Sequence, residues 1–212
     1  MKNMKINQLV VGMCQTNCYI AYHKDTKEAI IIDPGDQAND IIMRCRMLEV
    51  YPKAILLTHG HFDHMMAASK IKETFEIPIY ASEKEVSLLA NARTNLSAMW
   101  ASPVSLEADI LVKEGEEYNL IGFSIQVIET PGHTVGGVCY YIPEEETVFS
   151  GDTLFYCSFG RTDFPTGSMS TLARSIREKL FTLPESTEVY PGHESSTTIG
   201  YEKRYNPLGG GF

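Results

Sequence analysis

The sequence predicts an α/β fold in a single domain spanning residues 1–212. Strand-like apolar runs alternate with helix-like segments along the chain, and no linker, repeat or low-complexity tract divides it apart from a terminal glycine run. With 43% hydrophobic and 21% charged residues, the chain has enough apolar material for a sizeable packed core. We expect residues 207–212, which include the glycine run, to form a frayed tail.

The first half of the chain begins with strand-like runs separated by turns. The elements expected here are strands over 6–11, 18–22 and 29–32, a helix over 40–50, a strand over 54–57, a helix over 64–75, a strand over 77–80 and a helix over 82–90. The first three strands predict a meander at one edge of a sheet. Ser82 is the expected N-cap of the last helix, with Glu85 at the capping-box position. Segment 91–106, which carries Trp100, is interpreted as a loop.

The second half repeats one pattern, in which a short strand is followed at once by a histidine or an aspartate. Its expected elements are strands over 123–129, 137–142, 147–149 and 188–190, and a helix over 169–180. His59, His133, Asp152 and His193 each follow a predicted strand. Open α/β sheets place their ligand sites beyond the carboxyl ends of strands, so these side chains are expected to share one site.

Charge and composition exclude several classes of function. Lys and Arg total 18 against 27 for Asp and Glu, a net charge of −9, which disfavours nucleic acids and anionic membranes as partners. The N-terminal residues contain neither a signal peptide nor a membrane span, so a cytoplasmic location is expected. The five cysteines are an odd number scattered through apolar segments, which indicates isolated buried thiols rather than disulfides.

The densest chemical cluster is the segment from Thr58 to His64, with three imidazoles and one carboxylate within six residues. Chance produces this spacing with a probability on the order of 10⁻⁴ over the chain, and a core has no reason to concentrate groups that are costly to bury. His59 and His61 are spaced to bind one metal ion, and Asp63 and His64 are placed to face a second. Two adjacent cations repel and need a shared anion, which Asp152 and a bridging hydroxide supply. The distant His133 and His193 then complete the two ligand sets.

The motif H-x-H-x-D-H, followed by Pro-Gly-His133, Gly-Asp152 and Pro-Gly-His193, resembles the metallo-β-lactamase superfamily over nearly the whole chain. The segments at 150–155, 160–164 and 197–202 are similar to the glyoxalase II-like, or hydroxyacylglutathione hydrolase-like, branch. The resemblance implies a four-layer αβ/βα sandwich with a dinuclear metal site at its edge. It assigns the first metal to His59, His61 and His133, the second to Asp63, His64 and His193, and the bridge to Asp152. The resemblance implies two divalent ions. Zinc is the metal expected first, and iron and manganese suit the same ligands.

The implied activity is hydrolysis of small thioesters, such as S-lactoylglutathione or related acyl-thiols, by a metal-bridging hydroxide. Asp63 is the carboxylate expected to orient and deprotonate the attacking water. A thiolate leaves without a dedicated acid, because an ordinary thiol has a pKa of about 8.5. The alternative is a mononuclear-iron persulfide dioxygenase of the same superfamily, which shares a Gly-Arg-Thr-Asp-Phe segment. A metal-binding protein without turnover, a nuclease and a β-lactamase are less favoured.

Against this resemblance we expect a short form, without the helical C-terminal domain that supplies part of the glutathione contact in that branch. Arg161 and Asp163 stand where those enzymes carry a Lys and a Tyr. Arg161 is expected to bind a substrate carboxylate, and Asp163 to support the metal ligands from behind.

Four other residues flank the motifs. Phe155 and Tyr156 follow the bridging aspartate and are expected to wall the substrate pocket. Met66 and Glu194 stand at positions where a glycine is common in the branch, and we expect both to reshape the pocket rim.

Overall fold

The computed structural model describes residues 2–210, which form two six-stranded sheets. The first sheet has the order β1 (Met4–Val11), β2 (Thr16–His23), β3 (Glu28–Ile32), β4 (Tyr51–Leu56), β5 (Ile79–Ser82) and β6 (Ile110–Val112). The second has the order β14 (Thr197–Thr198), β13 (Glu188–Pro191), β10 (Thr147–Gly151), β9 (Val138–Ile142), β8 (Phe123–Glu129) and β7 (Glu117–Leu120). The short strands β11 (Leu154–Phe155) and β12 (Ser158–Phe159) pair separately.

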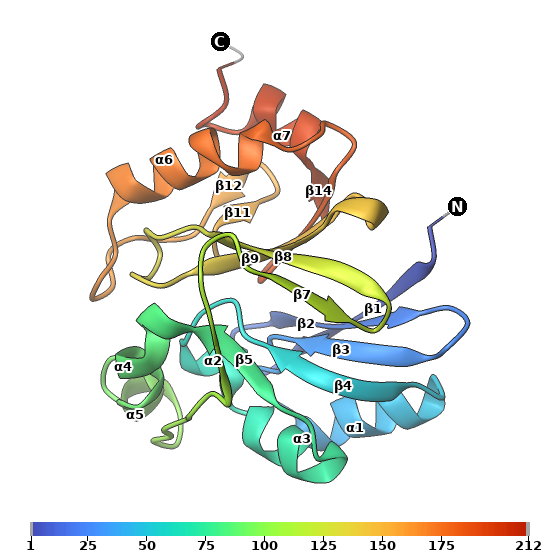
Figure 1. The fold of residues 1–212 in the computed structure, drawn as a ribbon. Coiled ribbons are helices and arrows are strands. Elements are labelled where there is room, and N and C mark those ends of the chain that lie inside the picture. The colour runs from blue at the N-terminus through green and yellow to red at the C-terminus, as the bar shows by residue number, and fades with distance from the viewer. Residues whose placement is uncertain (1, 211–212) are drawn as a thin grey trace.

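Helices cover the outer face of each sheet, so the molecule has four layers (Figure 1). The helices are α1 (Ala38–Met47), α2 (Phe62–Met65), α3 (Ala68–Phe75), α4 (Val86–Leu89), α5 (Ser97–Trp100), α6 (Met169–Glu178) and α7 (Ile199–Tyr205), with single 3-10 turns η1 (Glu83–Glu85), η2 (Pro143–Glu145) and η3 (Leu180–Thr182). Helices α1 and α3 lie on the first sheet, and α6 and α7 lie on the second. The predicted α/β sandwich is therefore confirmed.

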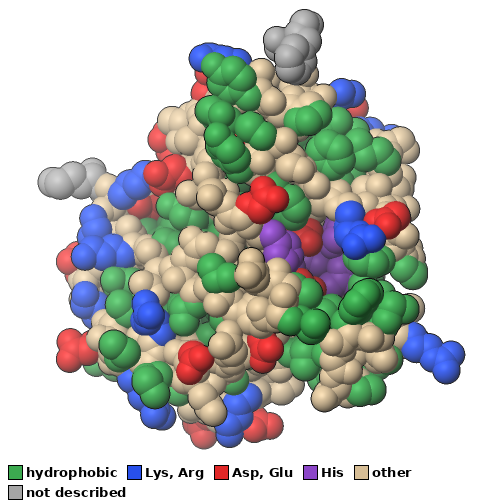
Figure 2. All heavy atoms as spheres, turned by 180° about the vertical axis from the view of Figure 1, so that it is seen from behind, with side chains coloured by type: hydrophobic (Ala, Val, Ile, Leu, Met, Phe, Trp, Pro, Cys, Tyr) green, Lys and Arg blue, Asp and Glu red, His purple; other side chains and the backbone are tan. Residues whose placement is uncertain are grey.

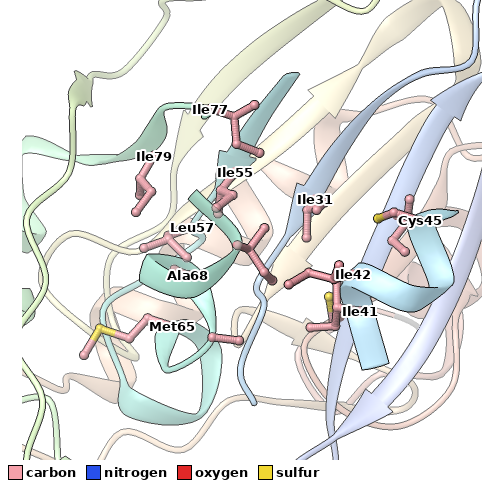
Figure 3. Packing of buried hydrophobic residues seen from close by; sticks show 14 of the residues in the cluster. Ile31, Ile41, Ile42, Cys45, Ile55, Leu57, Met65, Ala68, Ile77 and Ile79 are labelled. Carbon is pink, nitrogen blue, oxygen red and sulfur yellow. The ribbon is translucent and has the colours of Figure 1, made fainter. Parts of the chain in front are cut away.

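The core is divided by the sheets according to the two-residue period of the strands. In β3, Ile30 and Ile32 pack between the two sheets, whereas Ala29 and Ile31 pack against the helices. Figure 3 shows the helix-side cluster, where Ile41 and its neighbours from α1 meet side chains from the strands. Residues 29–32 of β3 and 54–56 of β4 are buried, so these parts of the two strands are continuous apolar runs in the sequence.

The predicted edge meander is confirmed, since β1, β2 and β3 pair antiparallel in sequence order. Strands β3 to β6 then run parallel, which brings the carboxyl ends of β3, β4 and β5 to one edge. The predicted strand over 77–80 is shifted to Ile79–Ser82. Strands β6 and β7 were not predicted, because runs of three and four residues carry too little alternation to be distinguished from loops.

The predicted helix over 64–75 is wrong in its continuity, because it is divided into α2 and α3. The Ala67 amide donates to Pro34 O at 3.0 Å instead of continuing the helix. The Pro34–Gly35 backbone approaches so closely that a Cβ on Gly35 would lie 1.7 Å from Asp63 O. The break allows α2 to present Asp63 and His64 while α3 packs on the sheet.

The predicted helix over 82–90 is also changed. Ser82 caps η1, its Oγ accepting from Lys84 N at 3.2 Å, as expected. Glu85 does not complete a capping box. Its fully buried carboxylate accepts from Gly60 N and from Gly136 N, both at 2.8 Å. Glu85 therefore joins the loop that carries His59 and His61 to the loop that follows His133.

The predicted frayed tail is wrong at Leu208, which is buried with α6 and whose carbonyl accepts from Arg177 Nε at 2.9 Å. Residues 211 and 212 of that tail lie outside the described residues. All five cysteines are free thiols, but Cys14 is exposed and Cys157 is half-buried, so the expectation of uniformly buried thiols is wrong for these two. Among the described residues, none of the helices has the length and hydropathy needed to cross a bilayer.

Candidate metal centre

The seven predicted ligands come together at one edge of the sandwich, beyond the carboxyl ends of four strands. β4 leads to the loop with His59 and His61, and α2 follows with Asp63 and His64. β8, β10 and β13 from the other sheet lead to the remaining three ligands: His133, Asp152 and His193. Figure 2 shows histidine side chains at the base of a hollow on this face.

Three imidazoles form the first cluster. His61 Nδ1 lies 3.1 Å from His59 Nε2 and 2.9 Å from His133 Nε2, and all three side chains are buried. His133 Nδ1 donates to Arg161 O at 2.7 Å, which leaves Nε2 directed at the cluster. Burial, reinforced by the charge of His133, lowers the pKa of His61 to about 3, so this imidazole is neutral and its lone pair is free to bind a cation.

The second cluster contains one carboxylate and two imidazoles. Asp63 Oδ2 lies 3.7 Å from His64 Nε2 and 3.4 Å from His193 Nε2. Burial alone would raise the pKa of Asp63, but the charge of His64 and a hydrogen bond from His193 lower it to about 2. Thr16 Oγ1 donates to the same Oδ2 at 3.0 Å and helps to fix the carboxylate.

Asp152 reaches both clusters with different oxygens. Its Oδ1 lies 3.4 Å from His64 Nε2, and its Oδ2 lies 3.4 Å from His133 Nε2 and 3.6 Å from His193 Nε2. Gly192 makes this approach feasible, because a Cβ there would lie 2.4 Å from Asp152 Oδ1 and 2.6 Å from His64 Cε1. The glycine of the Pro-Gly-His motif is therefore required by close packing against the other ligands.

The donor set fits divalent metal ions. Four donors about 2.1 Å from one tetrahedral ion lie about 3.4 Å from one another, close to the spacings within both clusters. The buried atoms His64 Nε2 and Asp152 Oδ1 have no hydrogen-bond partner in the described chain, although both point into the site. Buried polar atoms are seldom left unpaired, so these two are placed to bind a cation. The first cluster (His59, His61, His133) and the second (Asp63, His64, His193) are each close enough together to hold one ion.

Asp33 contacts the second cluster, although the sequence interpretation treated it only as part of a turn. Its buried carboxylate accepts from Thr58 N at 2.8 Å and Thr58 Oγ1 at 2.6 Å, and it lies 2.9 Å from His64 Nδ1. This contact favours a proton on Nδ1 of His64, so Nε2 is the nitrogen that would bind a metal ion in place of a proton. The available signal was its position directly after a buried strand, the same pattern that identified the ligands.

Asp33→Asn is expected to weaken metal binding about 10- to 100-fold. The Asn amide NH₂ facing His64 Nδ1 is a donor, so the imidazole is driven toward the tautomer that carries its proton on Nε2. Titration with Zn²⁺ against a chromophoric chelator measures the affinity, and circular dichroism checks the fold. Asp40→Asn, an exposed substitution in α1, is the matched control. Equal affinity of the Asp33 variant and the wild type would contradict this role.

A cavity of about 300 Å³ lies over the two clusters, with Asp63, Asp152 and His193 among its lining residues. Arg161 also lines it, but Asp163 binds the guanidinium at 2.7 and 2.6 Å. Asp163 is exposed and makes its side-chain hydrogen bonds to Arg161 rather than to a candidate ligand. The expectation that it supports the metal ligands is therefore wrong.

The two expected aromatic walls do not line this cavity. Phe155 is buried in β11, with its ring centroid 6.0 Å from that of His193, so it packs behind a ligand. Tyr156 turns away, and its hydroxyl lies 2.9 Å from that of Tyr201. Both were expected from their position in sequence, but the turn after β10 directs them elsewhere.

The two departures from glycine have different consequences. Met66 lines a smaller hollow of about 140 Å³ beside the cavity. Glu194 has φ +66°, in the left-handed region that favours glycine, and its carbonyl accepts from Asn17 Nδ2 at 2.8 Å. That hydrogen bond helps to hold the backbone next to His193 in place.

The comparisons with known proteins agree on one protein family. The model of the metallo-beta-lactamase superfamily matches residues 11–193. Hydroxyacylglutathione hydrolase GloC of Haemophilus influenzae is 38% identical over 209 residues, covering 97% of this chain and 98% of that protein.

Two solved structures are also similar. The BLEG-1 B3 metallo-beta-lactamase has a TM-score of 0.92 and 40% identity, covering 96% of this chain and 99% of the other. TTHA1623 in a di-iron-bound form has a TM-score of 0.83 and 33% identity, covering 95% and 99%. The family match, these likenesses and the cluster of histidines and aspartates agree, and the chain belongs to the metallo-β-lactamase superfamily, as a divalent-metal-binding hydrolase of its glyoxalase II-like branch.

Proposed function

We propose that this chain hydrolyses small thioesters with the help of two divalent ions, and that zinc is the preferred metal. The observation that carries the proposal is the carboxylate of Asp152, whose two oxygens face the two ligand clusters beneath one cavity. The ligands of one ion are His59, His61 and His133, and those of the other are Asp63, His64 and His193. GloC, which is named a hydroxyacylglutathione hydrolase, supports a thioester as the substrate.

The chemistry requires a nucleophile, a base and a site for negative charge. When bound, the ions lower the pKa of water and provide positive charge where the carbonyl oxygen becomes negative. Asp63 lines the cavity and accepts the proton of the attacking water. The C–S bond then breaks and the sulfur leaves as a thiolate, the acyl group becomes a carboxylate, and the protons released from the water pass through Asp63 to the thiolate and the solvent. Because a thiol has a pKa of about 8.5, the chain needs no separate acid for this leaving group.

The protein around Asp63 fixes its position during the reaction. Thr16 Oγ1 and the imidazole of His193 both lie within 3.4 Å of Asp63 Oδ2. Glu85 ties together the loops on either side of the first cluster. The ligands are thus held in place before substrate binds, which lowers the cost of reorganisation during catalysis.

The test is a metal-loading and turnover experiment. Protein stripped with a chelator is dialysed against zinc, iron(II) or manganese(II), its metal content is measured, and hydrolysis of S-lactoylglutathione and other acyl thioesters is followed by thiol release. We expect about two ions per chain and loss of more than about 99% of activity after stripping. Absence of thiol release with every loaded metal would contradict the proposal.

β-Lactam hydrolysis is the second candidate, favoured by the 40% identity to the BLEG-1 enzyme. The same loaded protein is assayed with a chromogenic cephalosporin. We expect a kcat/KM at least about 100-fold below that for the best thioester. Oxygen consumption with a glutathione persulfide tests the dioxygenase alternative, and product formation there without thioester hydrolysis would replace our proposal.

A further inference from the structure

Part of the cavity lining consists of apolar side chains that the metal chemistry does not use. We call the set of Met13, Leu96, Trp100 and Phe164 the apolar wall. Met13 is 70% exposed and Trp100 is 54% exposed, which is unusual for large apolar side chains grouped at one site. Figure 2 shows hydrophobic side chains beside the histidines of the hollow. Such a surface next to a reactive centre is typical of a ligand-binding pocket.

The part of the wall that carries Trp100 is anchored to the metal-binding segment. Phe62 N, one residue before Asp63, donates to Asn95 O at 2.9 Å. The buried Asn95 side chain donates to Val104 O at 2.9 Å and accepts from Ser97 N at 2.9 Å. Leu96 has φ +70°, a strained value for a leucine, and is held there by these bonds. The indole is thus presented by a turn that is fixed relative to Asp63.

The charges around the cavity do not favour an anionic substituent. Among its described lining residues Arg161 is the single Lys or Arg, and both its Nε and its Nη2 are bound by Asp163. Its guanidinium carbon also lies 3.9 Å from the Phe164 ring centroid, so one face of the guanidinium makes a cation–π contact with this ring. The adjoining hollow is lined by Asp36 and Asp63, with no Lys or Arg in the described lining. The glutathionyl group carries two carboxylates, and the described lining side chains offer them only one cation, the guanidinium of Arg161, which Asp163 already pairs.

We propose that the apolar wall binds an uncharged aliphatic or aromatic group of the substrate, with Trp100 as the main contact, and that this group rather than a glutathionyl group sets substrate preference. The inference rests on the proposed function for the scissile bond, but the recognition itself depends only on the wall. Each methylene buried against the wall is expected to tighten binding about fourfold. The group is attached either to the carbonyl or to the sulfur, and the ligand series below separates these two positions.

Trp100 is the one tryptophan of the chain, so its fluorescence reports directly on the wall. The ligands are ketone analogues R–CO–CH₂–S–R′, which resist hydrolysis. One series extends R from methyl to hexyl and phenyl, a second extends R′ in the same way, and a third has R′ as the glutathionyl group. We expect a blue shift of the indole emission and a Kd that falls at least tenfold along one of the apolar series. Tightest binding by the glutathionyl analogues, or unchanged emission throughout, would overturn the inference.

Variants of the loaded enzyme give a second readout. The measured quantity is the ratio of kcat/KM for apolar thioesters to kcat/KM for S-lactoylglutathione. Trp100→Ala is expected to lower this ratio at least tenfold, and Trp100→Phe is expected to restore most of it. Met99→Ala is the matched control, because Met99 is 69% exposed in the same turn but does not line the cavity. An unchanged preference in Trp100→Ala would contradict the inference.

The two proposals fail in distinguishable ways. Tight binding of apolar analogues without hydrolysis of any thioester would support binding by the apolar wall and contradict the proposed thioesterase activity. Efficient hydrolysis with a preference for S-lactoylglutathione would support the thioesterase activity and contradict the role of the apolar wall.

Discussion

Asp152→Ala is expected to lower the metal content below one ion per chain and to lower kcat/KM for thioesters by about 10³-fold or more. The carboxylate approaches His64 with Oδ1 and both His133 and His193 with Oδ2. Without it, two adjacent cations lack the anion that offsets their repulsion. Plasma mass spectrometry after dialysis against zinc measures the content, and thiol release measures the rate.

The matched control is Asp163→Ala, because Asp163 binds Arg161, which lines the cavity, and none of the candidate ligands. Its metal content is expected to equal that of the wild type. Retention of two ions and of full activity by Asp152→Ala would show that the two clusters do not depend on a shared carboxylate.

Asp63→Asn is expected to lower kcat by about 10²- to 10⁴-fold, with a smaller effect on KM. The amide keeps an oxygen for a metal and for the hydroxyl of Thr16, but it does not accept the proton of the attacking water. Steady-state kinetics at saturating zinc separates the two parameters. Metal analysis of the same sample shows whether the variant is slow because of lost proton transfer or because of lost metal.

Asp36→Asn is the control for charge, since Asp36 lines the adjoining hollow and is outside both ligand clusters. We expect its kcat to lie within about threefold of the wild type. If Asp63→Asn binds its full metal content and keeps the wild-type kcat, another residue is the base. If Asp63→Asn loses metal and the wild type shows no turnover, the results would favour a metal-binding protein that is not an enzyme.

The candidate ligands could be proposed from sequence because four of them follow short apolar strands and because histidine and aspartate are costly to bury without a partner. His59 and His61 are neighbours in sequence, so local spacing alone indicated a shared ion. His133, Asp152 and His193 were placed by the repeated strand-and-ligand pattern. The break between α2 and α3 was not predictable, because it depends on the approach of Gly35 to the carbonyl of Asp63.

The residues that support the ligands were harder to predict. Asp33 was interpreted as part of a turn and Glu85 as a cap, since both residue types are common in those roles. Their carboxylates instead bind groups 25 or more residues away in sequence. Phe155 and Tyr156 show the opposite error, because nearness to Asp152 in sequence did not place them in the cavity.

Sequence alone was enough to predict the chemical groups available, the alternation of strands and helices, and the charge that disfavours polyanions. These follow from side-chain chemistry and local periodicity, which each segment carries alone. The tertiary structure was needed to show that Asp33 lies against His64, that Asp163 neutralises Arg161, and that the turn with Trp100 lies beside the candidate metal centre. Those relations depend on how two sheets pack and where distant loops meet, and no short segment encodes the distance between side chains on different strands.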